Sequence, residues 1–228
     1  ELLKSELKNC NFKKSAFDTI LILDSKNGNL LKNIKLMDKL IKNEEFLNLL
    51  NRKIKSEKDV CSAPLHLNDI QKLSINQINL IKNKIKLTSE EILILSFRSL
   101  DTVIFYDMKN NIINHLIIDL FTEQHSPRLH DDGYLYVFNN DIATENSKIV
   151  KINLKINKIE SYFTSEKFKS GVRGRIQFIK NELFIQSSSQ GEIFKIDCKI
   201  KFFESCKEKY LYSSNFSFFY PSNTYDDS

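Results

Sequence analysis

The chain has 228 residues, of which 41% are hydrophobic and 28% charged, and its formal net charge is +5. With only 5 Gly and 3 Pro, the composition excludes a collagen-like chain and argues against disorder, and the length allows one β domain with a sizeable core. The positive charge is spread as Lys beside Asn and Ile without a basic block, which favours a solvated surface and no nucleic-acid partner.

Targeting signals and metal motifs are not evident in the chain. No apolar run approaches the roughly 18 residues that a transmembrane helix needs, so no membrane segment is expected. The chain starts at Glu1, without Met or a signal peptide, and we expect a fragment or a processed piece, for which missing signals mean little. The four cysteines form no Cys-x-x-Cys pair, and neither a metal nor a cofactor is expected. Cys198 and Cys206 are placed to meet across a hairpin, but two buried free thiols are the favoured reading.

Four stretches of the chain match one another. Each is an alternating apolar strand, a turn of the Asp-x-Lys type (Asn-x-Lys in the third copy) and a second strand, and the copies begin at Asp18, Asp101, Ser147 and Gly191. The last three begin 46 and 44 residues apart. A strand-built period of about 40–50 residues is typical of a β-propeller with one blade per repeat. We therefore predict an all-β fold, a single, incomplete β-propeller domain over residues 1–228 with about four blades, some of them incomplete.

The first part of the chain departs from the repeat. The first copy lacks inner strands, so the chain is expected to open inside a blade. Residues Leu36–Lys58 have apolar side chains at mixed three- and four-residue spacing, which predicts a short helical insert. Residues Ile75–Thr88 are interpreted as a further hairpin or an irregular insert. Both segments lie between the first and second copies and account for the longer gap there.

Three later blades can be laid out strand by strand, and the Asp131-Asp132-Gly133 turn within them is a strong hairpin signal. The first of these blades is expected to begin near Leu65 and to continue as Ile92–Phe97, Thr102–Tyr106 and Ile112–Ile118. The second comprises Pro127–His130, Tyr134–Phe138, Ile149–Ile152 and Lys158–Phe163. The third comprises Arg175–Ile179, Glu182–Gln186, Glu192–Ile196 and Lys201–Ser205. The closing segment Tyr210–Pro221 is interpreted as the inner strand of another blade, so the propeller is incomplete and its edges are exposed unless the missing part is supplied.

Polar side chains precede the inner strands of successive blades at one equivalent position. His66 and His125 occupy it in two blades, and the same count back from the second strand gives Arg173 in the next. In a propeller this position faces the mouth of the central channel, where ligands bind. Each side chain taken alone is more simply a turn residue bonded to backbone, but the shared register favours a site.

Further polar residues follow the same register. Arg128 comes shortly after His125, and Arg98 closes the strand Ile92–Phe97. Asn68 and Asp69 are placed to hold an imidazole tautomer. A ring of His and Arg around a channel suits an anion such as sulfate, phosphate or a carboxylate.

Other titratable residues are assigned simpler roles. His115 is expected on the surface and His130 in solvent at a turn. Asp107 and Asp197 follow strands in turn positions and are expected to be structural.

At these residues the sequence resembles the arylsulfotransferase family. The resemblance rests on HLNDI (His66–Ile70), ILILSFRSLDTVIFYD (Ile92–Asp107), QHSPRLHDDGYLYVFNN (Gln124–Asn140) and SKIVKIN (Ser147–Asn153). These segments are similar to the family's His-x-Asn motif, its Ile-Leu-x-Ser-x-Arg strand followed by Asp, and its Gln-His-x-x-Arg motif. The resemblance covers most of the chain from Asp18 to Asp197, and its most specific piece is QHSPRLHDDG.

The resemblance implies a six-bladed propeller and a defined chemistry. A phenolic sulfate ester gives its sulfuryl group to a His, and a second phenol takes it, without the usual nucleotide donor. By this carry-over His125 and His66 are the candidate reactive and assisting imidazoles, and Arg128 and Arg98 are the candidate sulfate contacts. Arg173, which follows from the shared register, and Asn68 are the further substrate-binding candidates. The partners would be an aryl sulfate and a phenol acceptor, and the location would be periplasmic or extracytoplasmic.

A second function stays open. Residues Asp141–Lys148 hold no Arg and residues Gly171–Gln190 hold no His, although active members of the family have such residues in these places. The alternative is a propeller that binds an anionic ligand or a protein partner without turnover, because a scaffold alone does not determine function.

Overall fold

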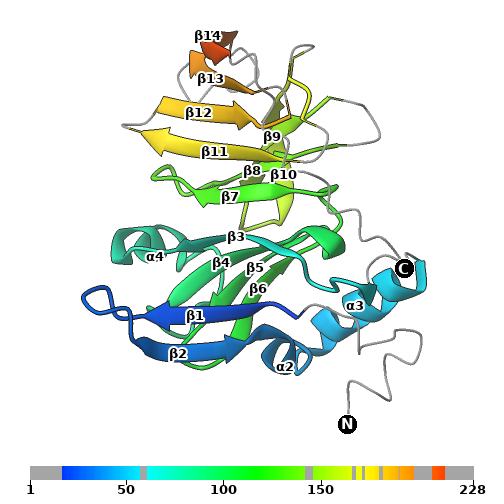
Figure 1. Cartoon of the computed structure of the whole chain (residues 1–228), viewed down its shortest axis with the longest axis vertical. Helices are drawn as coiled ribbons and strands as arrows, with labels where there is room; N and C mark the ends of the chain where they lie inside the picture. The colour runs from blue at the N-terminus through cyan, green and yellow to red at the C-terminus, as the bar shows by residue number, and fades with distance from the viewer. Residues whose placement is uncertain are drawn as a thin grey trace, which may run out of the picture.

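The computed structural model describes residues 17–56, 61–141, 146–165, 168–170, 173–179, 182–189, 191–197 and 207–213. Within these residues the strands form three four-stranded sheets and one two-stranded sheet, stacked along the longest axis of the molecule (Figure 1). Each strand pairs antiparallel with the next one along the chain, so every sheet is a simple meander. Few helices accompany them, and the fold is all-β.

The two-stranded sheet contains β1 (Thr19–Leu23) and β2 (Leu30–Lys35). The next sheet contains β3 (Leu67–Lys72), β4 (Ile92–Phe97), β5 (Thr102–Asp107) and β6 (Ile112–Ile117). It is followed by β7 (His125–Leu129), β8 (Leu135–Asn139), β9 (Lys148–Asn153) and β10 (Lys158–Phe163). The last sheet contains β11 (Gly174–Ile179), β12 (Glu182–Ser187), β13 (Glu192–Asp197) and β14 (Lys207–Ser213). The helices are α2 (Leu36–Leu40), α3 (Glu44–Ser56), α4 (Ile75–Ile81) and the 3₁₀ turn η3 (Arg98–Leu100).

The two middle sheets are covered on both faces. In β5, Ile104 and Tyr106 belong to a core shared with β1, β2, α2 and α3, whereas Val103 and Phe105 belong to a core shared with β7–β9. β8 divides its side chains in the same way, between that second core and a third shared with β11–β13. Successive side chains of a strand point to opposite faces, so the nearly continuous apolar run of β5 supplies both cores at once.

The first strands of the three large sheets, β3, β7 and β11, lie side by side (Figure 1). Side chains link them. The Ser126 hydroxyl donates to the Ile176 carbonyl (3.2 Å) and accepts from the Ile176 N–H (3.1 Å), which joins β7 to β11. The Gln71 side-chain oxygen accepts from the Leu129 N–H (2.9 Å), which joins β3 to β7. These bonds hold the beginnings of successive sheets near one another, as the shared register of His66 and His125 requires.

The helical insert is confirmed, but the structure divides it. The side-chain oxygen of Asn43 accepts from the Phe46 N–H (2.9 Å) and caps α3, so the chain turns between α2 and α3. The buried face of α3 consists of Phe46, Leu49, Leu50 and Ile54.

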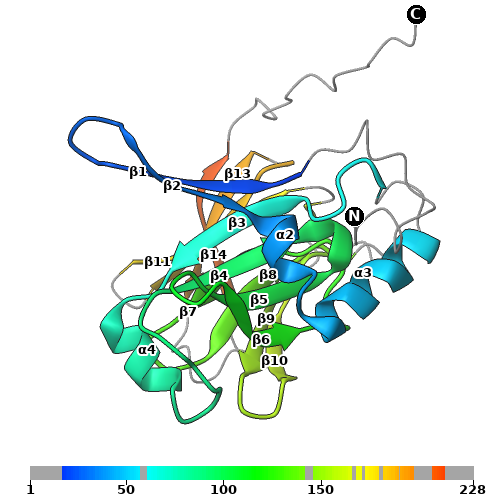
Figure 2. The same cartoon turned by 90° about the horizontal axis from the view of Figure 1, so that it is seen from below.

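The interpretation of Ile75–Thr88 as a hairpin or an irregular insert is wrong, because the segment begins with helix α4. The Ser74 hydroxyl accepts from the Gln77 N–H (3.2 Å), and the Gln77 side chain accepts from the Ser74 N–H (3.1 Å). This reciprocal capping box satisfies two amide groups that a helix start leaves unpaired. Ile78 and Ile81 then bury the inner face of α4, and α3 and α4 lie at opposite ends of the β3–β6 sheet (Figure 2).

Most predicted strands are confirmed, with shifts of a few residues at their ends. Ile92–Phe97 and Lys158–Phe163 are found with the predicted bounds. The predicted strand Lys201–Ser205 lies outside the described residues. Tyr210–Ser213 is not the inner strand of a further blade, since it belongs to β14 and pairs with β13. The rest of Tyr210–Pro221 lies outside the described residues, and the described sheets do not close into a ring, so the propeller stays a prediction.

Asp107, at the end of β5, is a structural turn residue, as predicted. Its carboxylate accepts from the Thr88 hydroxyl (2.5 Å) and from the N–H groups of Lys109 (2.8 Å) and Asn110 (2.9 Å). Burial would raise the pKa of this carboxyl, but the hydrogen bonds from Thr88 and Asn110 lower the pKa to about 2. Asp197, predicted to be its counterpart, ends β13.

We expect Asp107→Asn to lower the free energy of unfolding by about 2 kcal/mol at pH 7, because the amide lacks the charge that these donors stabilise. The folded pKa of about 2 lies below the reference value of 3.8. The carboxylate's contribution is therefore complete above the unfolded pKa and is lost as the pH falls through the folded pKa. Urea titrations at pH 7 and near pH 2 measure the free energy of unfolding of both proteins. The difference between wild type and variant should be smaller at the lower pH. Asp24→Asn is the matched control, since Asp24 holds the same kind of turn through the Lys26 N–H (2.7 Å) at an exposed position.

Candidate functional site

His125 begins β7 at the end of a tightly held loop. Glu123 and Ser126, on either side of it, both have φ 50°, in the left-handed region. The His125 Nδ1 lies 2.9 Å from the Glu123 carbonyl oxygen and 3.4 Å from the side-chain amide nitrogen of Asn140. Because a carbonyl oxygen can only accept, the shorter contact places the proton on Nδ1 and the lone pair on Nε2, and in this tautomer the Asn140 amide nitrogen, itself a donor, makes no hydrogen bond to Nδ1. The tautomer is thus set by Glu123. Asn68 and Asp69, predicted to hold an imidazole tautomer, are bonded to the Gln124 carbonyl and to Arg128.

Burial lowers the pKa of His125 to about 4. The hydrogen bond to the Glu123 carbonyl opposes this shift, the positive charges of Arg98 and His66 add to it, and Asp69 opposes it. At neutral pH His125 is therefore an uncharged imidazole with a free lone pair, which is the form that acts as a nucleophile or a base.

This lowered pKa predicts that the protein loses stability in mild acid. His125 is neutral in both states above its reference pKa of 6.5. As the pH falls from 6.5 toward 4, the unfolded chain takes up a proton that the folded chain does not. The free energy of unfolding should therefore decrease across this window, by up to about 3 kcal/mol from His125 alone. Denaturant titrations at pH 7 and pH 4.5 measure the decrease, which should be smaller in His125→Gln. An equal decrease in both proteins would contradict the lowered pKa.

His66 lies close to His125, directly before β3. It has φ 49°, and its carbonyl oxygen accepts from the Arg98 N–H (3.1 Å). His66 keeps much of its surface exposed, yet partial loss of hydration lowers its pKa, and Arg98 adds to this, while Asp18 and Glu123 oppose it. The two imidazoles predicted to be equivalent are thus near enough for the charge of one to act on the other.

The two arginines predicted to bind sulfate are each paired with a carboxylate. Arg98, in η3, forms an ion pair with Glu123. Arg128 contacts Asp69 through two nitrogens, at 2.8 and 3.0 Å. Such a two-point contact matches the planar guanidinium to the carboxylate, so an incoming anion would share or displace Asp69.

The other predicted contacts differ in position. The Asn68 amide nitrogen donates to the Gln124 carbonyl (2.8 Å), so Asn68 fixes the loop that carries His125. Arg173 lies directly before β11 with an exposed side chain.

Three residues of the site were not singled out from the sequence. Glu123 orients both His125 and Arg98, and Asp101 accepts from the Glu123 N–H (2.6 Å). The fully buried Gln124 donates its amide to the Ser96 hydroxyl and to the carbonyls of Phe97 and Thr102. Glu123 and Gln124 directly precede His125. This position beside a candidate site residue was the sequence signal that could have identified them.

Two histidines lie elsewhere than expected. His130 is only 8% exposed, and its ring centroid lies 4.2 Å from that of Phe178, so the prediction of a solvated turn residue is wrong. Tyr136 of β8 and Phe178 of β11 pack against this ring. His115, expected on the surface, is half-buried, packs edge-on against Phe105 and contacts the Asn157 side chain (3.2 Å).

A cavity of about 320 Å³ lies where the three first strands meet. Gln71 of β3, Arg128 of β7 and Gln177 of β11 line it, together with His130 and Phe178. Its volume is at the lower end of the range that small-molecule sites occupy. Arg128 therefore belongs both to the Asp69 pair and to the wall of this cavity.

Metal, membrane and thiol features complete the description. In the described part of the chain, no group of three or more His, Cys, Asp or Glu side chains is placed to hold a metal ion. No helix among the described residues has the length and apolar character needed to cross a membrane. Cys61 is disulfide-bonded, and the prediction for Cys198 and Cys206 falls outside the described residues.

Comparison with protein-family models agrees with the motifs. The family model described as Arylsulfotransferase (ASST) matches residues 6–203. A crystal structure of a protein of unknown function from Bacteroides caccae is 13% identical, with a TM-score of 0.47, over 88% of this chain and 55% of that one. The hydrazine synthase of Kuenenia stuttgartiensis is 15% identical, with a TM-score of 0.39, over 54% of this chain and 33% of that one. The chain thus spans about half or less of these solved chains, and no curated protein matches it.

Proposed function

The chain belongs to the arylsulfotransferase family, and from this premise we propose that it is part of a β-propeller that transfers a sulfuryl group from a phenolic sulfate ester to a phenol. His125 carries the group between the two. The observation that carries this proposal is the uncharged His125, whose Nδ1–H is held by the Glu123 carbonyl at 2.9 Å while Nε2 keeps its lone pair.

The first half-reaction joins His125 to sulfur. The Nε2 lone pair attacks the sulfur atom of the ester, the N–S bond forms, and the S–O bond to the aryl group breaks. The phenolate leaves with the electron pair of that bond. In the second half-reaction the oxygen of the acceptor phenol attacks the same sulfur, a new O–S bond forms, and the N–S bond breaks. The electron pair of the N–S bond returns to Nε2, which restores the neutral imidazole, and the proton of the phenol passes to solvent. A covalent carrier of this kind produces ping-pong kinetics.

Cationic groups near His125 support this chemistry. The sulfuryl oxygens hold negative charge during transfer, and fixed positive charges offset it. We assign Arg98 and Arg128 to sulfate contacts, His66 to assistance, and Asn68 to the loop that presents His125. Arg173 is assigned to the same anion from the neighbouring sheet. We place the aryl group in the cavity beside Arg128, whose volume of about 320 Å³ can hold it and whose apolar lining consists of Leu129 and Phe178.

One observation favours the alternative of a binding protein without turnover. Both guanidinium groups are already occupied, Arg98 by Glu123 and Arg128 by Asp69. Pairs of this kind would attract an anionic ligand less strongly than free arginines would. A protein partner with side chains of both charges could contact the arginine and the carboxylate of each pair.

A chromogenic assay separates the two functions. The full-length protein is incubated with 4-nitrophenyl sulfate and a phenol acceptor, and release of 4-nitrophenol is followed. Release that requires the acceptor and gives parallel double-reciprocal plots supports the transferase. Absence of release, together with protection of the fold from heat by the sulfate ester, supports the binding protein.

A further inference from the structure

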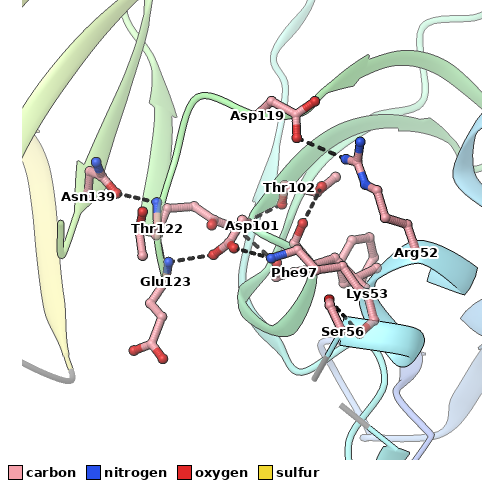
Figure 3. A network of polar contacts seen from close by, with 12 residues as sticks. Arg52, Lys53, Ser56, Phe97, Asp101, Thr102, Asp119, Thr122, Glu123 and Asn139 are labelled. Atoms are coloured by element: carbon pink, nitrogen blue, oxygen red, sulfur yellow. Dashed lines mark hydrogen bonds and ion pairs between the residues drawn. The ribbon is translucent and has the colours of Figure 1, made fainter. Parts of the chain in front are cut away.

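Asp101 stands between the helical insert and the loop of His125. It follows η3 with φ 49°, a left-handed conformation in which Asp and Asn are tolerated better than most residues. Its two carboxylate oxygens face different partners (Figure 3). One lies 2.5 Å from the Lys53 ammonium of α3, and the other accepts from the Glu123 N–H at 2.6 Å.

Both peptide groups that flank the Glu123 Cα atom are hydrogen-bonded. Its N–H is held by Asp101, and its carbonyl oxygen holds the His125 Nδ1 at 2.9 Å. The preceding Thr122 N–H donates to the Asn139 side chain (2.7 Å), which fixes the other end of the same loop. Glu123 has φ 50°, a conformation that costs energy for a non-glycine residue and persists only when its surroundings enforce it.

We propose that Asp101 is a positioning residue for His125, and that Lys53 orients the Asp101 carboxylate, so that α3 is coupled to the orientation of the imidazole. The importance of this coupling for turnover rests on the proposed function. The coupling itself is independent of that function, because the His125 tautomer can be measured in a protein without activity.

A neighbouring ion pair shows why burial makes this contact effective. Arg52, one residue before Lys53, pairs with Asp119 at 2.9 Å. Asp119 lies in the connection between β6 and β7, which also contains Glu123. The side chains of that pair are 56% and 66% exposed, whereas those of Lys53 and Asp101 are 17% and 20% exposed. Exposed pairs are screened by water and contribute little. Removal of Arg52 is therefore the matched control for removal of Lys53.

The test is the tautomer of His125, measured in the full-length protein by ¹⁵N NMR of the histidine side chains. His125 is faced by Arg98, His66, Asp69 and Glu123, so spectra are recorded at pH 7.5, where the imidazole is neutral. Wild type and Arg52→Met should show the Nδ1–H form. Lys53→Met and Asp101→Ala should show a mixture with the Nε2–H form.

Conservative variants keep the test decisive if Asp101→Ala does not fold. Asp101→Asn retains an oxygen for the Glu123 N–H but places an amide against Lys53, so it should show partial loss. Adding Lys53→Met to it should change the tautomer little further, because both substitutions interrupt the same Lys53–Asp101 contact. A merely structural contact would lower stability in each variant without this non-additive change in the tautomer.

Turnover supplies the second readout. If the transferase function holds, Lys53→Met should lower kcat about tenfold with little change in KM, as expected for a misplaced reacting group. If the protein shows no turnover but the tautomer changes as described, positioning by Asp101 stands and the proposed function fails. An unchanged Nδ1–H tautomer in folded Lys53→Met and folded Asp101→Asn overturns the positioning proposal, whatever the activity.

Discussion

Replacing His125 by alanine should reduce sulfuryl transfer by roughly a thousandfold or more, because alanine has no nitrogen to form the N–S bond. The measurement is the rate of 4-nitrophenol release from 4-nitrophenyl sulfate in the presence of a phenol acceptor. Added imidazole should restore part of the activity, since it supplies the missing nucleophile in the space that the side chain leaves.

His115→Ala is the control for this prediction. His115 lies on β6, where its contacts are Phe105 and Asn157, so its loss should change stability more than turnover. Equal activity losses in the two variants would show that neither histidine has a special role. Full activity in His125→Ala would refute the covalent route through this residue.

The second large effect concerns packing at Gly174, the first residue of β11. A Cβ atom built there lies 2.0–2.3 Å from ring atoms of Phe138. Phe138 is fully buried, and its ring packs edge-on against Phe168 with centroids 5.1 Å apart, so it has little room to move. Gly174→Ala should therefore lower the free energy of unfolding by about 3 kcal/mol, as measured by urea denaturation.

Two further variants check the cause. Phe138→Leu shortens the clashing side chain, and combined with Gly174→Ala it should cost less than the sum of the single changes. Gly28→Ala adds a methyl group where nothing lies within 4 Å, but at φ +74°, and it should cost only about 1 kcal/mol through the left-handed backbone. If Gly174→Ala were no worse than Gly28→Ala, the close approach of β11 to Phe138 would not control stability.

The sequence predicted the sheets well because strand formation is signalled locally. A nearly continuous apolar run such as Ile92–Phe97 indicates a strand with two buried faces, and the Asp131-Asp132-Gly133 turn indicates a hairpin. The same local logic was available for α4, where Ser74 and Gln77 form a capping box, but the short apolar run beside it was interpreted as strand or irregular chain. The prediction for Tyr210–Ser213 failed for a different reason, since pairing of β14 with β13 depends on a partner strand and not on the segment alone.

The sequence named some residues of the candidate site, but it did not predict their contacts or the part played by Glu123. His125 and His66 could be recognised as equivalent because the repeat gives them the same register. That Arg128 pairs with Asp69, or that His130 is covered by Phe178, could not be recognised, because these partners are separated by tens of residues in the chain.

By itself, then, the amino-acid order determined the all-β character, the succession of meander sheets and the histidines that head two of them, since all of these depend on neighbours within a few residues. Only the tertiary structure decided which oxygen fixes the His125 tautomer, how far burial lowers its pKa, and which carboxylates accompany the arginines. Those properties depend on distance, solvent exclusion and charge between separate sheets, and such relations come into existence only when the sheets pack together.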